Sequence, residues 1–163
     1  MIQITKGTDT EKNYTYMLKT IEMTLADEQD VIANLSNLSA MINSYVSDLN
    51  WCGFYLLKDN GDLVLGPFQG APACVRIPAG KGVCQHGVST REIILVDDVE
   101  AFPGHIACDS ATRSELVCPI FKNGEVYGVL DLDSPLPARF TELEKTYMQQ
   151  VCDLITSFLS HKI

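Results

Sequence analysis

Hydrophobic residues in the first third of the chain recur every three or four positions, which is the period of an amphipathic α-helix. This pattern predicts one helix over residues 13–26 and another from about residue 27 to residue 47, and a similar pattern predicts a last helix from Thr141. The three apolar stripes are Tyr14, Met17, Leu18, Ile21 and Leu25; Val31, Leu35, Leu38, Ile42, Tyr45 and Leu49; and Tyr147, Val151, Leu154, Ile155 and Phe158. Each stripe needs an apolar surface to cover it.

The middle of the chain changes to a period of two, which is typical of β-strands. Two hairpins are predicted: WCGFYLL turns through KDNGDL into LVLGPF, and ELVCPIF turns through KNGE into VYGVLDLDS. Shorter strands are predicted in ACVRI and IILVDD, with a short helix in GKGVCQHGVSTRE between them. The order of elements predicts an α+β fold, with an antiparallel sheet and the N- and C-terminal helices on one face. Residues 1–163 contain no repeat or linker, so we expect a single domain.

Residues two apart in a strand share a face, and this parity predicts a pocket. Trp51 and Tyr55 fall on one face of their strand, Asp131 and Asp133 on one face of theirs, and Glu115 begins a third strand. If the faces rich in Leu and Ile pack on the helices, these five side chains converge on the far side of the sheet. We therefore expect a pocket with an aromatic wall and an acidic floor.

Two carboxylates placed side by side in a hydrophobic strand repel each other, and each raises the pKa of the other. Such a pair usually faces a cation, a metal or a substrate that needs a proton. Alternatively, Asp131 and Asp133 lie in water at an exposed strand end. The pair by itself does not favour a functional site over this exposed strand end.

Composition narrows the possible functions. The chain has 12 Lys and Arg against 21 Asp and Glu, a net charge of −9, which argues against a nucleic-acid partner. No apolar run has the length of a membrane span, and the N-terminus lacks the pattern of a signal peptide, so we expect a cytoplasmic protein with no membrane partner. In that compartment the six cysteines should be reduced at rest, with redox, catalytic, metal-binding or packing roles rather than a disulfide framework.

The cysteines fall into two groups. Cys52, Cys118 and Cys152 lie at core positions of a strand or helix, and we interpret them as small packing residues. Cys74, Cys84 and Cys108 lie in or near irregular segments. Cys108 belongs to VEAFPGHIACDSATRS, and long loops in compact domains are usually functional.

A metal site is an alternative reading of the second group of cysteines. Cys84 and His86 could combine with His105 and Cys108, but these pairs lack the tight cysteine spacing of structural zinc sites. We therefore predict no metal, and we interpret both histidines as ordinary loop or surface residues.

Several motifs together resemble one known family. WCGFYLL, GPFQG, ACVRIPAGKGVC, DVEAFPGHIACDSATRSELV and GVLDLDSP are similar to the free methionine-(R)-sulfoxide reductases, which are built on a GAF domain. The resemblance runs from about Trp51 to Phe140. Cys118 departs from it, because we expect a simple apolar residue at that position.

The resemblance implies a role for each pocket residue. Cys108 would be the nucleophile, and Cys84 and Cys74 would be resolving or auxiliary thiols. Glu115, Asp131 and Asp133 would bind the substrate and support its protonation, while Trp51 and Tyr55 would wall the methyl end.

The implied chemistry is reduction of free methionine sulfoxide without a cofactor. A thiolate attacks the substrate sulfur and becomes a sulfenic acid, a second thiol closes a disulfide, and a thioredoxin-type dithiol reopens it. We expect Cys84 to be the second thiol, with Cys74 as a possible substitute. GAF domains commonly pair through terminal helices, so the resemblance also implies a homodimer. The alternative is a GAF module that senses a small molecule without catalysis.

Overall fold

The computed structural model describes residues 1–161. Three long helices are present: α1 (Thr10–Asp27), α2 (Val31–Tyr45) and α4 (Glu142–Ser160). Each begins at an oxygen-bearing cap, because the side chains of Asp9, Asp30 and Thr141 accept a hydrogen bond from a backbone N–H in the first turn. At α4 the cap is reciprocal, since Glu144 also accepts from the backbone of Thr141. No helix among these residues is long and apolar enough to span a membrane.

The sheet has six strands in the order β3-β2-β1-β6-β5-β4, and every pairing is antiparallel. The strands are β1 (Trp51–Leu57), β2 (Leu63–Gly70), β3 (Arg76–Ile77), β4 (Ile94–Val96), β5 (Ser114–Lys122) and β6 (Glu125–Ser134). Both predicted hairpins are confirmed, as β1–β2 and β5–β6. They meet at the β1–β6 pairing, which places the two hairpins at the centre of the sheet.

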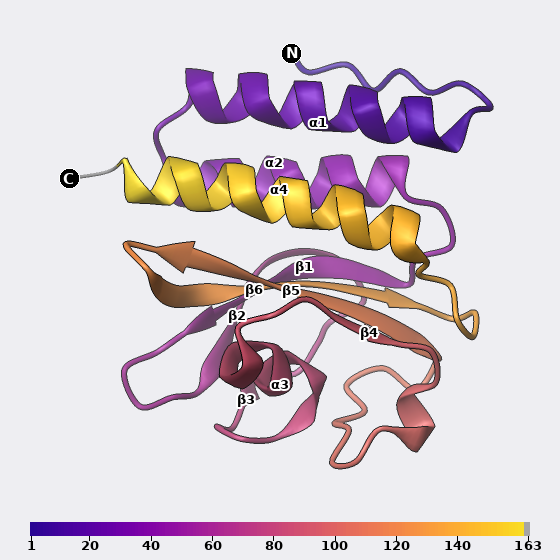
Figure 1. The fold of residues 1–163 in the computed structure, drawn as a ribbon, viewed down its shortest axis with the longest axis vertical. Helices are drawn as coiled ribbons and strands as arrows, with labels where there is room; N and C mark the ends of the chain where they lie inside the picture. The colour runs from indigo at the N-terminus through magenta and orange to yellow at the C-terminus, as the bar shows by residue number, and fades with distance from the viewer. Residues whose placement is uncertain (162–163) are drawn as a thin grey trace.

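The helices and the sheet form layers that can be followed in Figure 1. Helices α2 and α4 lie on one face of the sheet, and α1 lies outside them, against both helices rather than against a strand. The short helix α3 (Gly82–Thr90), the 3-10 turn η1 (Val99–Ala101) and the long loop lie on the opposite face. The predicted α+β fold with its terminal helices on one face is therefore confirmed, with α1 as an additional outer layer.

Two hydrophobic cores fill the spaces on the two faces. The larger core lies between the helices and the sheet and includes Cys52, Cys118 and Cys152, which are almost fully buried. The expected packing environment of these three cysteines is thus confirmed. The smaller core lies on the other face and contains Trp51 and Tyr55.

Some predicted details were wrong. Leu49 lies beyond the end of α2, and the ACVRI strand is reduced to the two residues of β3. In α4 the fully covered positions include Met148 and Cys152, whereas Tyr147, Leu154 and Phe158 are only partly buried. The shift follows from packing, because α4 lies between α1 and the sheet and its buried face is broader than one stripe.

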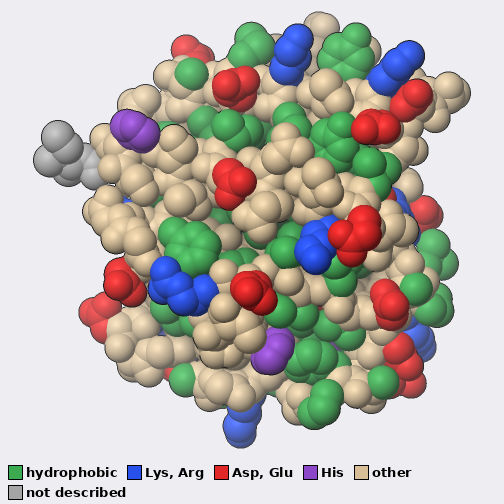
Figure 2. All heavy atoms as spheres, in the orientation of Figure 1, with side chains coloured by type: hydrophobic (Ala, Val, Ile, Leu, Met, Phe, Trp, Pro, Cys, Tyr) green, Lys and Arg blue, Asp and Glu red, His purple; other side chains and the backbone are tan. Residues whose placement is uncertain are grey.

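The surface agrees with the acidic composition. On the face drawn in Figure 2, the Lys and Arg side chains are scattered among Asp and Glu side chains rather than gathered into one patch. This face offers no basic surface of the kind that a phosphate backbone needs.

Candidate active site

Strand register brings the predicted pocket residues into rows across the sheet. Trp51 of β1 pairs with Asp133 of β6, and Asp133 pairs with Glu115 of β5. The next row on the same face places Asp131 opposite Gly53. Because neighbouring strands lie about 4.8 Å apart, one row spans three strands within about 10 Å. The predicted convergence of these residues is confirmed.

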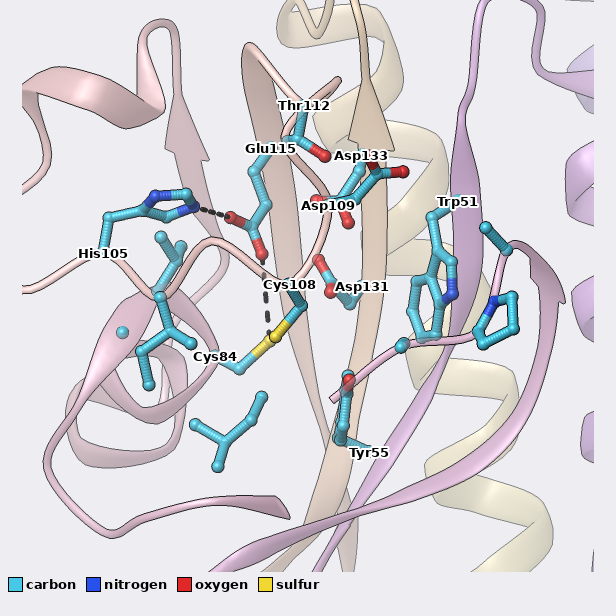
Figure 3. Close-up of a pocket in the computed structure, with 17 residues that line it drawn as sticks. Trp51, Tyr55, Cys84, His105, Cys108, Asp109, Thr112, Glu115, Asp131 and Asp133 are labelled. Atoms are coloured by element: carbon cyan, nitrogen blue, oxygen red, sulfur yellow. Dashed lines mark hydrogen bonds and ion pairs between the residues drawn. The ribbon is translucent and has the colours of Figure 1, made fainter. Parts of the chain in front are cut away.

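The converging side chains line a cavity of about 40 Å³ beneath α3 and the loop. Figure 3 shows the carboxyl groups of Glu115, Asp131 and Asp133 directed into it, with Trp51 and Tyr55 along one side. A water molecule needs about 10–15 Å³ of such space, so the cavity has room for about three. The side chains therefore leave little free space in the pocket while the disulfide is closed.

Burial controls the protonation of the three carboxyl groups. Burial, and then repulsion by Asp131, raises the pKa of Glu115 and that of Asp133 well above the ordinary carboxyl range. Burial also raises the pKa of Asp131 to about 6, while hydrogen bonds from its neighbours oppose the rise. Asp131 therefore ionises first, and the other two carboxyls hold protons beside it. Asp131 Oδ1 and Asp133 Oδ1 have no hydrogen-bond partner, so polar groups face the cavity unsatisfied.

Cys84 is held as a neutral thiol on the α3 side of the pocket, opposite the sheet. It lies in α3, is 3% exposed, and its Sγ is 3.9 Å from Glu115 Oε1. Burial, followed by the negative charge of Asp131, raises its pKa well above the ordinary value. A thiol in these surroundings is a poor nucleophile because its thiolate is disfavoured.

Cys108 is joined to Cys74 by a disulfide, with their Cα atoms 5.4 Å apart. This corrects two expectations: the six cysteines are not all reduced, and the disulfide partner of Cys108 is Cys74 rather than Cys84. The disulfide connects two irregular segments that lie 34 residues apart in sequence. Cys108 lines the cavity, as Figure 3 shows, so the disulfide fixes the loop at the edge of the pocket.

The aromatic wall is ordered by stacking and by one glycine. The ring of Trp51 stacks on Tyr55 at 5.6 Å and on Phe68 at 5.3 Å between centroids. A Cβ on Gly53 would lie 2.3 Å from Phe68 Cβ, so the absence of a side chain there lets β2 carry Phe68 close to Trp51. The Tyr55 hydroxyl donates to the backbone oxygen of Cys74 at 2.8 Å, which ties the wall to the disulfide.

Three polar side chains of the pocket were not predicted from the sequence. His105, Asp109 and Thr112 all line the cavity, and His105 Nε2 lies 3.9 Å from Glu115 Oε2. The interpretation of His105 as an ordinary loop residue was therefore wrong, whereas His86 is exposed as expected. The loop has no periodicity, so no pattern indicated which of its residues turn inward.

The described residues include one group with the chemistry of a metal site, formed by Cys84, Glu115 and Asp131. Their ligand atoms lie within 4.8 Å of one another. The metal site considered from the sequence used other residues. Two of those are not available as ligands in the pocket, because Cys108 is in a disulfide and His86 is exposed. Raised pKa values at the Cys84 thiol and the Glu115 carboxyl favour protons over a cation at these ligands.

Comparison with known proteins gives consistent matches. The model of the GAF domain family matches residues 30–158. Protein YtsP of Bacillus subtilis is 48% identical over 153 residues, which cover 93% of this chain and 94% of that protein. The free methionine-R-sulfoxide reductase of Escherichia coli is 46% identical over 127 residues, which cover 78% of this chain and 76% of that enzyme.

Solved structures agree with these sequence matches. The X-ray structure of free methionine-R-sulfoxide reductase from Neisseria meningitidis in complex with its substrate has a TM-score of 0.93 at 39% identity. The match covers 98% of this chain and 96% of that one.

Proposed function

The chain belongs to the GAF-domain family and, within it, to the free methionine-R-sulfoxide reductases, which are oxidoreductases, and we propose that its pocket reduces free methionine sulfoxide by thiol chemistry. One observation carries this proposal. A disulfide between Cys74 and Cys108 closes a pocket whose floor holds three buried carboxyl groups. Reduction of a sulfoxide to a sulfide and water consumes two thiols, which supply two electrons and two protons, and it needs an acid that protonates the sulfoxide oxygen during the attack.

The proposed cycle has three balanced steps. In the first, the Cys108 thiolate attacks the substrate sulfur and a pocket carboxyl gives its proton to the sulfoxide oxygen; the sulfur–oxygen bond of the substrate breaks, the hydroxyl passes to Cys108 as a sulfenic acid, and methionine leaves. In the second, the Cys74 thiol displaces water from this sulfenic acid and forms the disulfide. In the third, an external dithiol of the thioredoxin type reduces the disulfide and is itself oxidised.

Cys74 takes the resolving role in this cycle because it is the cysteine bonded to Cys108. Cys84 is the auxiliary thiol: it stays protonated against Glu115 and acts through the shape of the pocket and its contact with this carboxyl. A Cys74→Ser variant should therefore give one equivalent of methionine and a trappable sulfenic acid on Cys108. Cys84→Ser should still close the disulfide, and failure to close it would return the resolving role to Cys84.

The carboxyl groups serve the substrate in two ways. Burial and repulsion raise the pKa values of Glu115 and Asp133, which favours their protonated forms, and they can donate a proton to the sulfoxide oxygen. Asp131 ionises first and can pair with the ammonium of a free amino acid. Trp51 and Tyr55 supply an apolar wall for the methyl end.

The order of events follows from the size of the cavity. About 40 Å³ is too little for an amino acid, so the disulfide must open and release the loop before substrate enters. A pocket roofed in this way selects a free amino acid, since a polypeptide could not pass through it.

We also propose that the chain forms a homodimer. The exposed Tyr16 and Met23 on the outer face of α1 are consistent with a partner there, and light scattering should give twice the monomer mass.

The test is an assay of the free R and S sulfoxides of methionine with thioredoxin, its reductase and NADPH. We expect turnover of the R form, with peptide-bound sulfoxide and methionine sulfone as controls that are not reduced. A parallel thiol titration distinguishes a sensor module, because a catalyst loses two thiols per chain on adding the substrate and a sensor loses none. Turnover of neither free sulfoxide would refute the proposal.

A further inference from the structure

Asn50, immediately before β1, makes two side-chain hydrogen bonds to the loop that carries Cys108. Its Nδ2 donates to Asp109 Oδ2 at 2.9 Å and to Thr112 Oγ1 at 3.0 Å. Its own backbone N–H donates to the carbonyl oxygen of Asp133 at 3.0 Å. Asn50 thus connects β6, through Asp133, to Asp109, the residue that follows Cys108.

Asp109 is suited to receive this contact as a carboxylate. Its Oδ1 accepts from the backbone N–H of Ala111 at 2.9 Å, so the carboxylate also shapes the turn after Cys108. The hydrogen bonds from Ala111 and then Asn50 lower its pKa, which keeps it charged near neutral pH. A hydrogen bond to a charged acceptor is stronger than one between neutral groups.

Few other polar contacts hold the segment 104–111 to the rest of the protein. Within residues 1–161, besides the disulfide, the segment reaches the strands through Asn50–Asp109 and through His105–Glu115. The second contact is 3.9 Å long. Burial lowers the pKa of His105 and raises that of Glu115, so burial disfavours the charged form of each partner and weakens their attraction.

The importance of Asn50 therefore depends on the redox state. While the Cys74–Cys108 disulfide is closed, a covalent bond fixes the loop. When it opens, the Asn50–Asp109 hydrogen bond remains and fixes the residue next to Cys108 relative to the strands, while Arg113 Nη1 holds the carbonyl oxygen of Ser110 at 2.9 Å. Catalysis by a thiol requires the sulfur to lie close to the substrate in the correct direction, and small displacements are costly.

We propose that Asn50 is a positioning residue that holds the Cys108 loop against the substrate pocket in the reduced enzyme. This inference rests on the proposed function. Asn50 does not line the cavity and touches no reacting atom. It acts through Asp109, so its loss should lower the rate at which bound substrate reacts more than it weakens substrate binding.

The decisive experiment exchanges the two partners. Asn50→Asp places a second carboxylate against Asp109 and should lower kcat about tenfold while KM changes less than threefold. Asp109→Asn should have a similar effect. The double variant Asn50→Asp/Asp109→Asn restores one donor and one carboxylate acceptor, and it should bring kcat back to within about threefold of the wild type.

A matched control is available at the β1–β2 turn. Asn60 Nδ2 also donates to an aspartate, Asp62 Oδ2, at 3.0 Å, but neither residue lines the pocket. Asn60→Asp introduces the same charge change and should leave kcat unchanged. A comparable loss of kcat in this control would assign the effect to net charge and overturn the proposal.

A second measurement covers the case in which Asn50→Asp does not fold. In reduced Asn50→Ala, amide hydrogen exchange should speed up across residues 104–111, while the strands keep their protection. In the oxidised protein the difference should shrink, because the disulfide fixes the loop. Unchanged exchange in the reduced variant, or a double variant no faster than the single ones, would overturn the proposal. Inactive wild-type protein would instead refute the proposed function.

Discussion

The two faces of the central sheet both bury acidic residues and cysteines, but they treat them in opposite ways. On the helix face, Glu144 is 4% exposed and receives hydrogen bonds from Tyr14, Arg139 and Thr141. Burial raises its pKa, but these hydrogen bonds outweigh burial and lower it to about 2. On the pocket face, Glu115 and Asp131 are buried to the same degree beside each other and beside Asp133, without a matching cation other than the loosely placed His105.

The difference separates stability from chemistry. A buried carboxylate with a full set of donors stays charged and holds elements together, here α1, α4 and the segment before α4. Buried carboxyls that face one another keep protons and unsatisfied oxygens, which is destabilising unless a ligand uses them. The cysteines divide in the same way, since those on the helix face are packing residues, whereas Cys84 and Cys108 line the cavity with the acids.

The largest contrast is expected between cysteines of the two faces. Cys108→Ser should abolish methionine formation even in a single turnover, because a hydroxyl is a far poorer nucleophile than a thiolate. Cys118→Val, on the helix face, should keep turnover within a few-fold of the wild type, because that thiol only packs. Rapid-quench analysis of reduced protein mixed with one equivalent of sulfoxide measures both, and a burst from Cys108→Ser would reassign the nucleophile.

Removing the charge of Glu144 should affect stability rather than catalysis. Glu144→Gln leaves Arg139 without its 3.0 Å ion pair and should cost about 2–4 kcal/mol of unfolding free energy, measured by urea denaturation. The KM for the sulfoxide should not change, because the residue lies on the other face of the sheet. A variant as stable as the wild type would show that this pair offers no advantage over a neutral hydrogen bond.

The acids of the pocket should show the reverse behaviour. Asp131→Asn and Asp133→Asn remove a charge or a proton donor at nearly constant size and should lower kcat/KM at least tenfold, about 1.4 kcal/mol. Neither should reduce the free energy of unfolding, since the substitutions relieve repulsion between buried groups. Full activity in either variant would place that side chain outside the substrate contacts.

Stability should depend on pH with opposite signs for the two faces. The pKa of Glu144 falls on folding, so its stabilising effect is complete above about pH 4.5 and disappears toward pH 2. The pKa of Asp131 rises to about 6 on folding, so its contribution is complete below about pH 4 and is lost as the pH rises through 6. Relative to wild type, Asp131→Asn should therefore gain stability between about pH 4 and pH 7. The stability deficit of Glu144→Gln relative to wild type should disappear only as the pH falls toward 2. Unfolding free energies from urea denaturation at several pH values test this, and the same pH dependence in both variants would contradict it.

The sequence predicted the regular part of the site and not the irregular part. Strand parity placed Trp51, Glu115 and Asp131 on one face because alternation along a strand is local and the hairpins fix the register. The outer position of α1 was not predictable, since an amphipathic stripe does not identify the surface that covers it. The Cys74–Cys108 pairing depends on how two irregular segments 34 residues apart meet in space. No short-range pattern encodes such a meeting.

The β5–β6 turn has a consequence for which insertions the protein could tolerate. Asn123 and Gly124 both have positive φ, as a tight two-residue hairpin turn requires, and the turn lies at the end of the hairpin opposite the pocket. One extra residue there that shifted β6 by one position would swing Asp131 and Asp133 toward the helices and send Leu130 and Leu132 into the pocket. Lengthening this turn should therefore be as damaging as mutating the acids themselves, although no atom of it touches them. Natural or engineered length variation should instead occur in the β1–β2 turn, where added residues leave the β5–β6 pairing untouched.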